Sequence, residues 1–160
     1  MTKLPMMNHL SRTWPAAVCM AAVIAASTAG CADTAEPPAS GPQTTTIEIS
    51  YDDLLNQKRV DREVTLRVGD FLQVSLGANA STGFSWAEQM QISDPEVLVQ
   101  TGHEAVGSAD GRPGGPGREV WVLQALSAGT STVSTTYGRP WEGGEKDSWT
   151  FTAAVTVTSR

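Results

Sequence analysis

Few side chains in this sequence could take part in covalent or metal chemistry. Its 160 residues include two cysteines, Cys19 and Cys31, and two histidines, of which only His103 lies beyond the first 31 residues. Thiolate catalysis, a zinc site and a catalytic triad each need cysteine, or histidine with a suitable partner, at a defined spacing. We therefore expect no catalytic residue, no metal and no cofactor. A pair of Asp and Glu residues acting as acid and base is the one enzymatic arrangement left open.

The residues best placed for function lie in a short loop whose main property is its backbone shape. The stretch reads Asn79-Ala80-Ser81-Thr82-Gly83-Phe84. It follows a strand-like run that ends at Leu76 and precedes Trp86, so small polar residues and one glycine separate two hydrophobic anchors. Gly83 can adopt a positive φ without steric cost. We expect a tight loop with an exposed, stiff tip.

Two further stretches have the same character. They read Gly114-Gly115-Pro116-Gly117 and Arg139-Pro140-Trp141, the second followed by Glu142-Gly143-Gly144. On its own, the glycine-rich region of residues 107–117 is more typical of a floppy hairpin tip than of a binding element. The small neighbours of Trp141 cannot easily bury it, which favours a groove on a partner molecule. Arg139 could hold its loop in shape by pairing with Glu142, Glu145 or Asp147.

The first thirty residues contain the zones of an export signal in the right order. Lys3 and Arg12 give a basic start, residues 14–26 form an apolar run too short for a permanent membrane span, and small residues precede Cys31. The end of this segment resembles the bacterial lipoprotein box, in which the cysteine is lipidated and becomes the mature N-terminus. We expect an exported protein anchored to the cell membrane through lipid on Cys31 and facing outward. The alternative is an ordinary signal peptide cut nearby.

Composition sets the boundaries of the domain and excludes some partners. Residues 31–46 are rich in Pro, Thr and Ala without apolar periodicity and predict a flexible tether, whose reach at ~3.3 Å per residue is ~50 Å. The net charge is −6, and it becomes −8 without residues 1–30, which hold two of the 11 basic residues and none of the 17 acidic ones. Nucleic acids and anionic lipid surfaces attract basic patches, so the negative charge argues against both as partners. One domain, residues 47–160, is expected as a monomer.

From Ile47 onward, hydrophobic residues recur with a period of two, as in half-buried strands. The predicted strands cover residues 47–51, 64–68, 72–76, 96–101, 118–125, 130–137 and 149–158. Gly69-Asp70 predicts a hairpin turn between the second and third strands, and residues 51–57 and 87–92 could each form a helical turn. Trp121, Trp149 and Phe151 fall within strand patterns and are expected in the core. Seven or eight such strands predict an all-β fold, an immunoglobulin-like antiparallel β-sandwich.

The three loops together resemble a known family. Residues 79–84 with Trp86 are similar to the Asn-Pro-Thr-Thr-Gly-Tyr/Phe-x-Trp motif of the chagasin-like inhibitors of papain-family cysteine peptidases. Residues 114–117 resemble the Gly-x-x-Gly loop of that family, and residues 139–141 resemble its Arg-Pro-Trp/Phe motif. The motifs occur in the family's order, and the likeness covers about residues 45–160. Ala80 and Ser81 depart from the motif, and the loss of proline at position 80 should leave the first loop less pre-organised.

The resemblance implies a protein inhibitor whose three loops cluster at one end of the sandwich and enter the cleft of a papain-like cysteine peptidase. It places Thr82 and Gly83 nearest the catalytic cysteine of the peptidase, residues 114–117 along one flank, and Arg139 and Trp141 along the other. The alternative is an envelope-tethered binding module that uses the same loops on a ligand other than a peptidase. An enzyme is disfavoured because the mature chain has no thiol and one histidine.

Overall fold

The computed structural model describes residues 41–108 and 111–160, so the predicted leader, Cys31 and most of the predicted tether lie outside the described residues. Within these ranges no helix has the length and apolar character needed to cross a membrane. In chain order the elements are β1 (Thr44–Ile49), α1 (Tyr51–Asn56), β2 (Arg59–Arg67), β3 (Phe71–Ala78), the 3-10 helix η1 (Ala80–Thr82), β4 (Ser85–Trp86), β5 (Gln91–Ile92), β6 (Leu98–Val106), β7 (Gly117–Ala125), β8 (Gly129–Gly138) and β9 (Trp149–Thr158).

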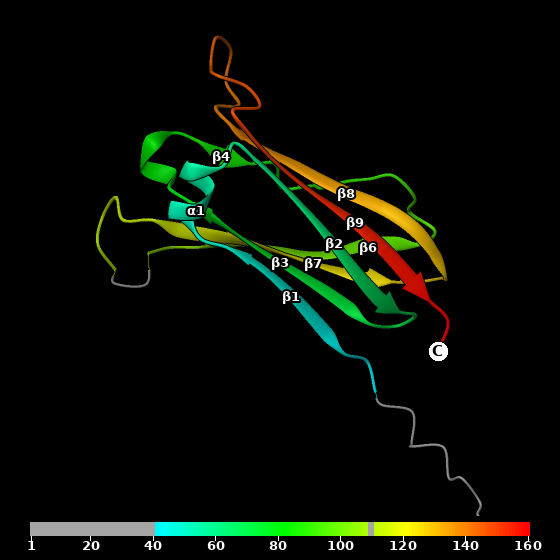
Figure 1. Cartoon of the computed structure of the whole chain (residues 1–160). Coiled ribbons are helices and arrows are strands. Elements are labelled where there is room, and N and C mark those ends of the chain that lie inside the picture. Colours follow the sequence, from blue (N-terminus) through cyan, green and yellow to red (C-terminus); the bar gives the residue numbers. More distant parts are fainter. Residues whose placement is uncertain (1–40, 109–110) are drawn as a thin grey trace, which may run out of the picture. The chain divides into compact units, whose positions relative to one another are not determined.

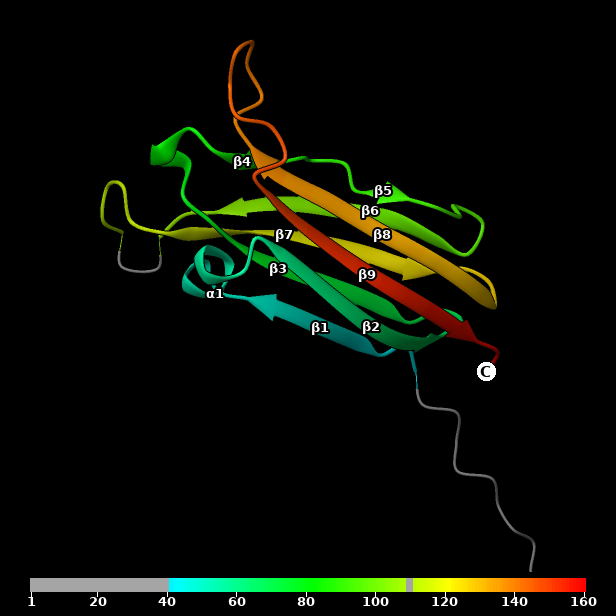
Figure 2. The same cartoon turned by 45° about the horizontal axis from the view of Figure 1, so that its top comes forward.

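The strands form two sheets that pack face to face, which confirms the predicted β-sandwich (Figure 1, Figure 2). One sheet has the order β1-β3-β7-β6, and the other has the order β2-β9-β8-β4 with β5 also paired to β8. Most neighbouring strands are antiparallel, but β1 pairs with β3 and β2 pairs with β9 in parallel.

The turn at Gly69-Asp70 does not close a hairpin, so that prediction was wrong. β2 lies in one sheet and β3 in the other, and the turn carries the chain between them. The chain changes sheets at this turn because β2 pairs with β9, where Val60 lies beside Phe151 and Leu66 beside Val157. The buried residues of both strands therefore lie on the same inner face of the sheet.

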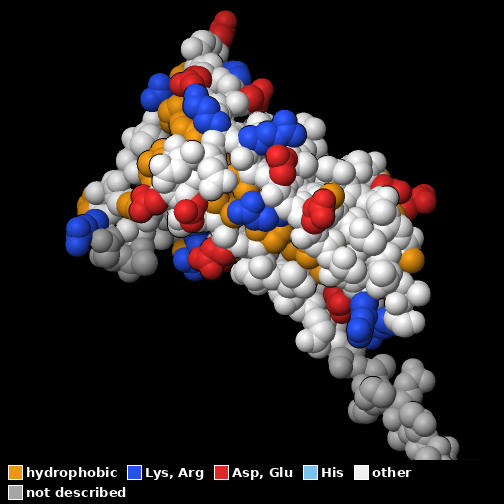
Figure 3. Space-filling model, viewed as in Figure 1, with side chains coloured by type: hydrophobic (Ala, Val, Ile, Leu, Met, Phe, Trp, Pro, Cys, Tyr) orange, Lys and Arg blue, Asp and Glu red, His pale blue; other side chains and the backbone are white. Residues whose placement is uncertain are grey.

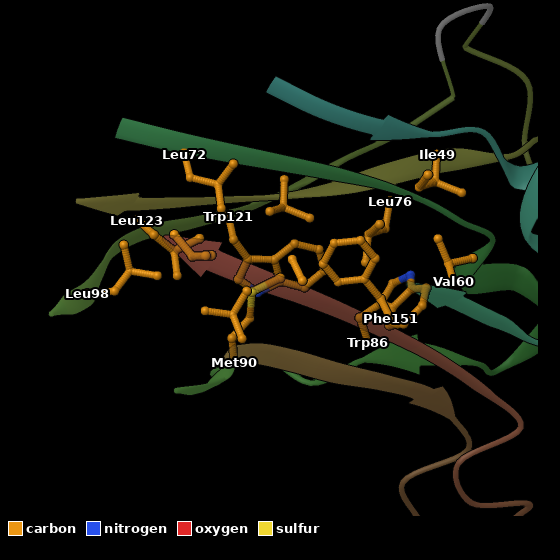
Figure 4. Packing of buried hydrophobic residues seen from close by; sticks show 14 of the residues in the cluster. Ile49, Val60, Leu72, Leu76, Trp86, Met90, Leu98, Trp121, Leu123 and Phe151 are labelled. Atoms are coloured by element: carbon orange, nitrogen blue, oxygen red, sulfur yellow. The ribbon is translucent and has the colours of Figure 1, made fainter. Parts of the chain in front are cut away.

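The core lies between the inner faces of the two sheets. In β9 the residues at alternate positions are buried, and they are Phe151, Ala153, Val155 and Val157. Figure 4 shows Trp86, Trp121 and Phe151 among the side chains that fill the space between the sheets. Each fully buried large side chain stabilises the fold by about 1.5–3 kcal/mol relative to exposure. The predicted core position of Trp121 and Phe151 is confirmed, whereas Trp149 is only partly buried.

The domain begins earlier than predicted, and its first strand ends earlier. β1 starts at Thr44, where three threonines of the predicted tether pair with residues 71–73 of β3. These β-branched residues suit a strand, although they lack apolar alternation. Tyr51 begins α1 and is not part of the strand, because the Ser50 side chain caps the helix by accepting a hydrogen bond from the Asp53 amide at 3.1 Å. Residues 87–92, a possible helical turn, instead contain β5.

Asp70 ties together three segments at the end of the sandwich where the C-terminus lies (Figure 1). Its carboxylate accepts hydrogen bonds from the Gln43 amide at 2.9 Å and from the Arg67 amide at 3.0 Å. Arg160 Nη2 lies 3.8 Å from the same carboxylate. The hydrogen bond from Gln43 is the main cause that lowers the pKa of Asp70; the Arg67 amide and the Arg160 charge add to it, and burial opposes it.

Candidate functional site

Strand pairing brings the three predicted loops to one end of the sandwich, away from the C-terminus (Figure 1, Figure 2). The first loop joins β3 to β4, the second joins β6 to β7, and the third joins β8 to β9. Ala78, which precedes the first loop, pairs with Gly117 at the end of the second. Ser85, which follows the first loop, pairs with Gly138 at the start of the third. The first loop therefore lies between the other two.

Side chains of the first loop hold its own backbone in one shape. Asn79 caps η1, and its Oδ1 accepts hydrogen bonds from the amide of Ser81 at 3.1 Å and from the hydroxyl of Ser81 at 2.6 Å. The Thr82 hydroxyl donates to the Asn79 carbonyl at 2.6 Å and accepts from the Phe84 amide at 3.3 Å. The amides of Thr82 and Gly83 donate to the carbonyls of Asn79 and Ala80. All four amides from Ser81 to Phe84 thus have partners, although Ala80 replaces the motif's proline.

Aromatic rings anchor the base of the first loop. The Tyr137 hydroxyl accepts a hydrogen bond from the Asn79 amide at 2.9 Å, and burial raises the pKa of Tyr137. The Phe84 ring lies 5.5 Å from the rings of both Tyr137 and Trp149. Trp86 is buried, and its indole donates to the Gly77 carbonyl at 3.0 Å. Trp86 therefore supports the loop from below, and the exposed part of the loop is its tip, Ala80 to Thr82.

The second loop contacts the first at the Gly114 carbonyl group. The Asn79 side-chain amide donates to the Gly114 carbonyl at 3.2 Å, and the Ser81 hydroxyl lies 3.5 Å from the same oxygen. Gly114 has a φ of +80°, which a residue with a side chain rarely adopts. A Cβ at Gly115 would lie 2.6 Å from the Ser108 hydroxyl oxygen, so the described part of this loop folds tightly on itself.

The third loop contacts the first through Arg139 and Trp141. Arg139 Nη2 donates to the Thr82 carbonyl at 3.3 Å, and its guanidinium carbon lies 4.6 Å from the centre of the Phe84 ring. The Trp141 ring packs against Gly83, yet Trp141 remains 51% exposed. Arg139 forms no ion pair with a carboxylate within the described residues, so the suggested pairing with an acidic neighbour was wrong. Arg139 instead contacts the Thr82 carbonyl and the rings of Phe84 and Trp141.

Lys146, which sequence reasoning missed, is an exposed residue of the third loop. Its ammonium group donates to the carbonyls of Arg139 at 2.9 Å, Pro140 at 2.6 Å and Trp141 at 2.6 Å. Its only signal in the sequence is that it is the single lysine among three acidic residues of this loop. In the space-filling view, hydrophobic, basic and acidic side chains lie around the base of this projecting loop, and a further acidic side chain lies at its tip (Figure 3).

His103 supports the fold beneath the loops. Its Nε2 lies 2.9 Å from one oxygen of the Glu119 carboxylate, and the other oxygen accepts from the Trp86 amide at 3.2 Å. The imidazole also lies 5.0 Å from the Trp121 ring. Across residues 41–108 and 111–160, no three His, Cys, Asp or Glu residues are grouped so that they could hold a metal ion. At this end of the sandwich the three loops present backbone groups, glycines, Arg139 and the exposed ring of Trp141.

Comparisons with known proteins identify a family whose match covers the part of the chain that contains the three loops. The family model described as Chagasin family peptidase inhibitor I42 matches residues 65–155, a range that includes all three. Amoebiasin-2 of Entamoeba histolytica is 28% identical over 104 residues, which are 65% of this chain and 84% of that protein. Chagasin of Trypanosoma cruzi is 33% identical over 91 residues, which are 56% of this chain and 83% of that protein.

The solved structures show a similar fold. One is the crystal structure of the cysteine protease inhibitor EhICP2 from Entamoeba histolytica, which has a TM-score of 0.55 to this chain at 21% sequence identity. The alignment covers 74% of this chain and 100% of that chain. At this level of identity the likeness concerns the arrangement of the strands.

Proposed function

The chain belongs to the chagasin family of peptidase inhibitors, and from this premise we propose that its three loops occlude the active-site cleft of a papain-like cysteine peptidase. Family members act on peptidases as inhibitors, and the protein itself is not an enzyme. The named relatives support cysteine peptidases as the target class, since they include chagasin and a cysteine protease inhibitor of the same fold.

One observation supports this proposal most strongly, namely that the first loop is tied to both of its neighbours. The Asn79 side chain donates to the Gly114 carbonyl, and the Trp141 ring packs on Gly83. Three tips held side by side in this way form one continuous surface. A typical protein–protein interface takes about 800 Å² from each partner, which three such loops can provide.

The rigidity of the first loop explains how it would enter a peptidase cleft without being cleaved. Its backbone amides are already paired within the loop, so little conformational entropy is lost on binding. Thr82 and Gly83 would lie nearest the catalytic cysteine, while residues 114–117 would contact one wall of the cleft, and Arg139 and Trp141 the other. The remaining predicted contact residues, Asn79, Ala80, Ser81, Phe84 and Pro140, would shape these tips.

We propose a location for the inhibitor from the first residues of the sequence. The basic start, the apolar run and the small residues before Cys31 support export and lipidation at that cysteine. Residues 32–43 would then act as a tether between the membrane and β1. The loops would face outward, where they could meet peptidases of the same cell, of a competitor or of a host. Mass spectrometry of the membrane fraction would test this, because acylation adds a defined mass to Cys31.

Titration of residues 32–160 into papain or a cathepsin, with a small fluorogenic substrate, tests the proposed activity. We expect activity to fall in proportion to added inhibitor until one equivalent is bound. No loss of activity with several papain-like enzymes would contradict the proposal and would favour a binding module for another ligand.

A further inference from the structure

We propose that Lys146 is a positioning residue whose ammonium group holds the third loop in its binding shape. The inference rests on the proposed function, because it concerns how Arg139 and Trp141 are presented to a peptidase. Lys146 belongs to none of the three motifs and is not itself placed in the cleft.

The contacts of Lys146 use the full donor capacity of its side chain. An ammonium group has three N–H donors and no acceptor. The three consecutive carbonyls of Arg139, Pro140 and Trp141 accept them at 2.9, 2.6 and 2.6 Å. Three acidic residues neighbour Lys146 in the sequence, yet none of their carboxylates forms an ion pair with it within the described part of the chain. The charge of Lys146 is therefore directed into the loop.

Three converging carbonyl groups favour a cation at their centre. Their oxygens carry partial negative charge and repel one another when they point at a single centre. An ammonium group at the centre attracts all three oxygens and so offsets their mutual repulsion. Charge-assisted hydrogen bonds are also about twice as strong as neutral ones. Without the ammonium group, the backbone of residues 139–141 would turn its carbonyls outward to water. That rotation would move the Trp141 side chain.

Besides these contacts, two backbone hydrogen bonds and the close approach of Gly144 to the Arg139 carbonyl hold the three residues within the loop. The backbone bonds across it are from the Arg139 amide to the Glu145 carbonyl at 2.7 Å and from the Gly144 amide to the Trp141 carbonyl at 3.1 Å. Gly143 lies at a positive φ of +73°, with open space around it. A loop with so few constraints of its own depends on side-chain contacts for order.

The shape of this loop determines how the first and third loops fit together. Arg139 reaches the Thr82 carbonyl, and the Trp141 ring lies against Gly83, the two residues proposed to sit nearest the catalytic cysteine. Loss of the lysine contacts would therefore weaken the contacts between the first and third loops at the centre of the proposed binding surface. Binding would then have to select the ordered loop from a mixture of conformations, which lowers affinity in proportion to the ordered fraction.

The test compares three variants of the full chain with the parent protein. Lys146→Met keeps the length of the side chain and removes the charge. Lys146→Arg keeps the charge but replaces the compact ammonium by a planar fork, which does not match three convergent carbonyls. Lys58→Met removes the same charge from an exposed lysine whose side chain makes no hydrogen bond or ion pair among the described residues, and it controls for net charge.

Inhibition constants against papain and the ¹⁵N order parameters of the free protein are measured for each variant. We expect Lys146→Met to raise the inhibition constant about tenfold, equivalent to one charge-assisted hydrogen bond, and to lower the order parameters of residues 139–146 only. Lys146→Arg should lie closer to Lys146→Met than to the parent, while Lys58→Met should match the parent.

Two results would overturn the role of Lys146. One is an unchanged loop and an unchanged inhibition constant in Lys146→Met. The other is full affinity in Lys146→Arg, which would show that charge alone matters. If the parent protein inhibits no papain-like enzyme, the proposed function fails. The order parameters would still decide whether Lys146 holds the loop.

Discussion

The Trp141 ring fills the space where a side chain on Gly83 would begin. A Cβ built at residue 83 would lie 2.5 Å from Cη2 of Trp141, closer than any ordinary contact. Gly83 also has a φ of +77°, in the left-handed region that favours glycine. Glycine is therefore required here for two reasons, one within its own loop and one across to the neighbouring loop.

Gly83→Ala should therefore weaken inhibition and stability by different amounts. Displacement of the Trp141 ring should raise the inhibition constant about 30-fold, as expected when an interface tryptophan is misplaced. The strained φ should lower the free energy of unfolding by about 1 kcal/mol. Inhibition assays and urea unfolding measure the two effects.

Gly143→Ala provides the matched control for this variant. Gly143 has a similar φ of +73° but has no atom within 4 Å of a Cβ built on it. It should lose similar stability and much less affinity. Equal losses of affinity in both variants would show that strain alone, and not contact with Trp141, explains the effect at Gly83.

Trp141→Ala should weaken binding more than any other truncation in the third loop. About half of the surface of Trp141 is exposed, and a peptidase groove could bury this exposed half. We expect a loss of at least about 2 kcal/mol of binding free energy, or ~30-fold in affinity, since tryptophan is a frequent hot spot. Circular dichroism would verify that the sandwich stays folded. An unchanged inhibition constant would remove this loop from the interface.

The sequence predicted the layers of the fold but not the direction of all strand pairs. Period-two alternation reports which face of a strand is buried, and it is the same for parallel and antiparallel neighbours. Leu66 in β2 was therefore assigned correctly to the buried face of a strand, whereas Val60 lies before the predicted strand of residues 64–68 and was missed. The pairing of these two residues with Phe151 and Val157 in β9 could not be read from the pattern. The turn at Gly69-Asp70 was misread as a hairpin because the alternation pattern also does not show which strands pair with each other.

The motifs located the loops, while the contacts between the loops came from the structure. Gly83 is predictable as a glycine in a tight turn, but its contact with Trp141 joins residues far apart in the sequence. Lys146 donates to backbone carbonyls, which every residue has, so no residue type marks its partners. Asp70 was seen only as a turn residue, because its bond from Gln43 depends on the tertiary fold.

A charge at Thr82 should weaken inhibition if this residue faces the catalytic centre. Thr82→Asp would bring a carboxylate into the cleft, and removing a charge from water without a partner is costly. Thr82→Asn has nearly the same shape without the charge and controls for the lost hydroxyl contacts. We expect the Asp variant to inhibit at least ~10-fold more weakly than the Asn variant. Equal inhibition by the two variants would exclude the first loop as the element that enters the cleft.

Asp70 should make the stability of the domain depend on pH. Its pKa is lowered in the folded state, so ionised Asp70 stabilises the fold at any pH above its ordinary pKa of about 4. This contribution is lost as the pH falls through the lower pKa of the folded state. At pH 7, Asp70→Asn should reduce the free energy of unfolding by about 2 kcal/mol, because an amide nitrogen would face one of the two backbone amides.

Urea unfolding between pH 7 and pH 2 provides the measurement for this position. The difference between the parent and Asp70→Asn should shrink as the pH falls below about 4, since protonated aspartic acid resembles asparagine. Asp61→Asn is the control, because Asp61 is exposed and its pair with Arg59 should contribute less than about 1 kcal/mol. A gap that stays constant down to pH 2 would mean that the Asp70 charge does not stabilise the fold. Asp70 lies at the end of the sandwich away from the loops, so inhibition by the folded variant should equal that of the parent.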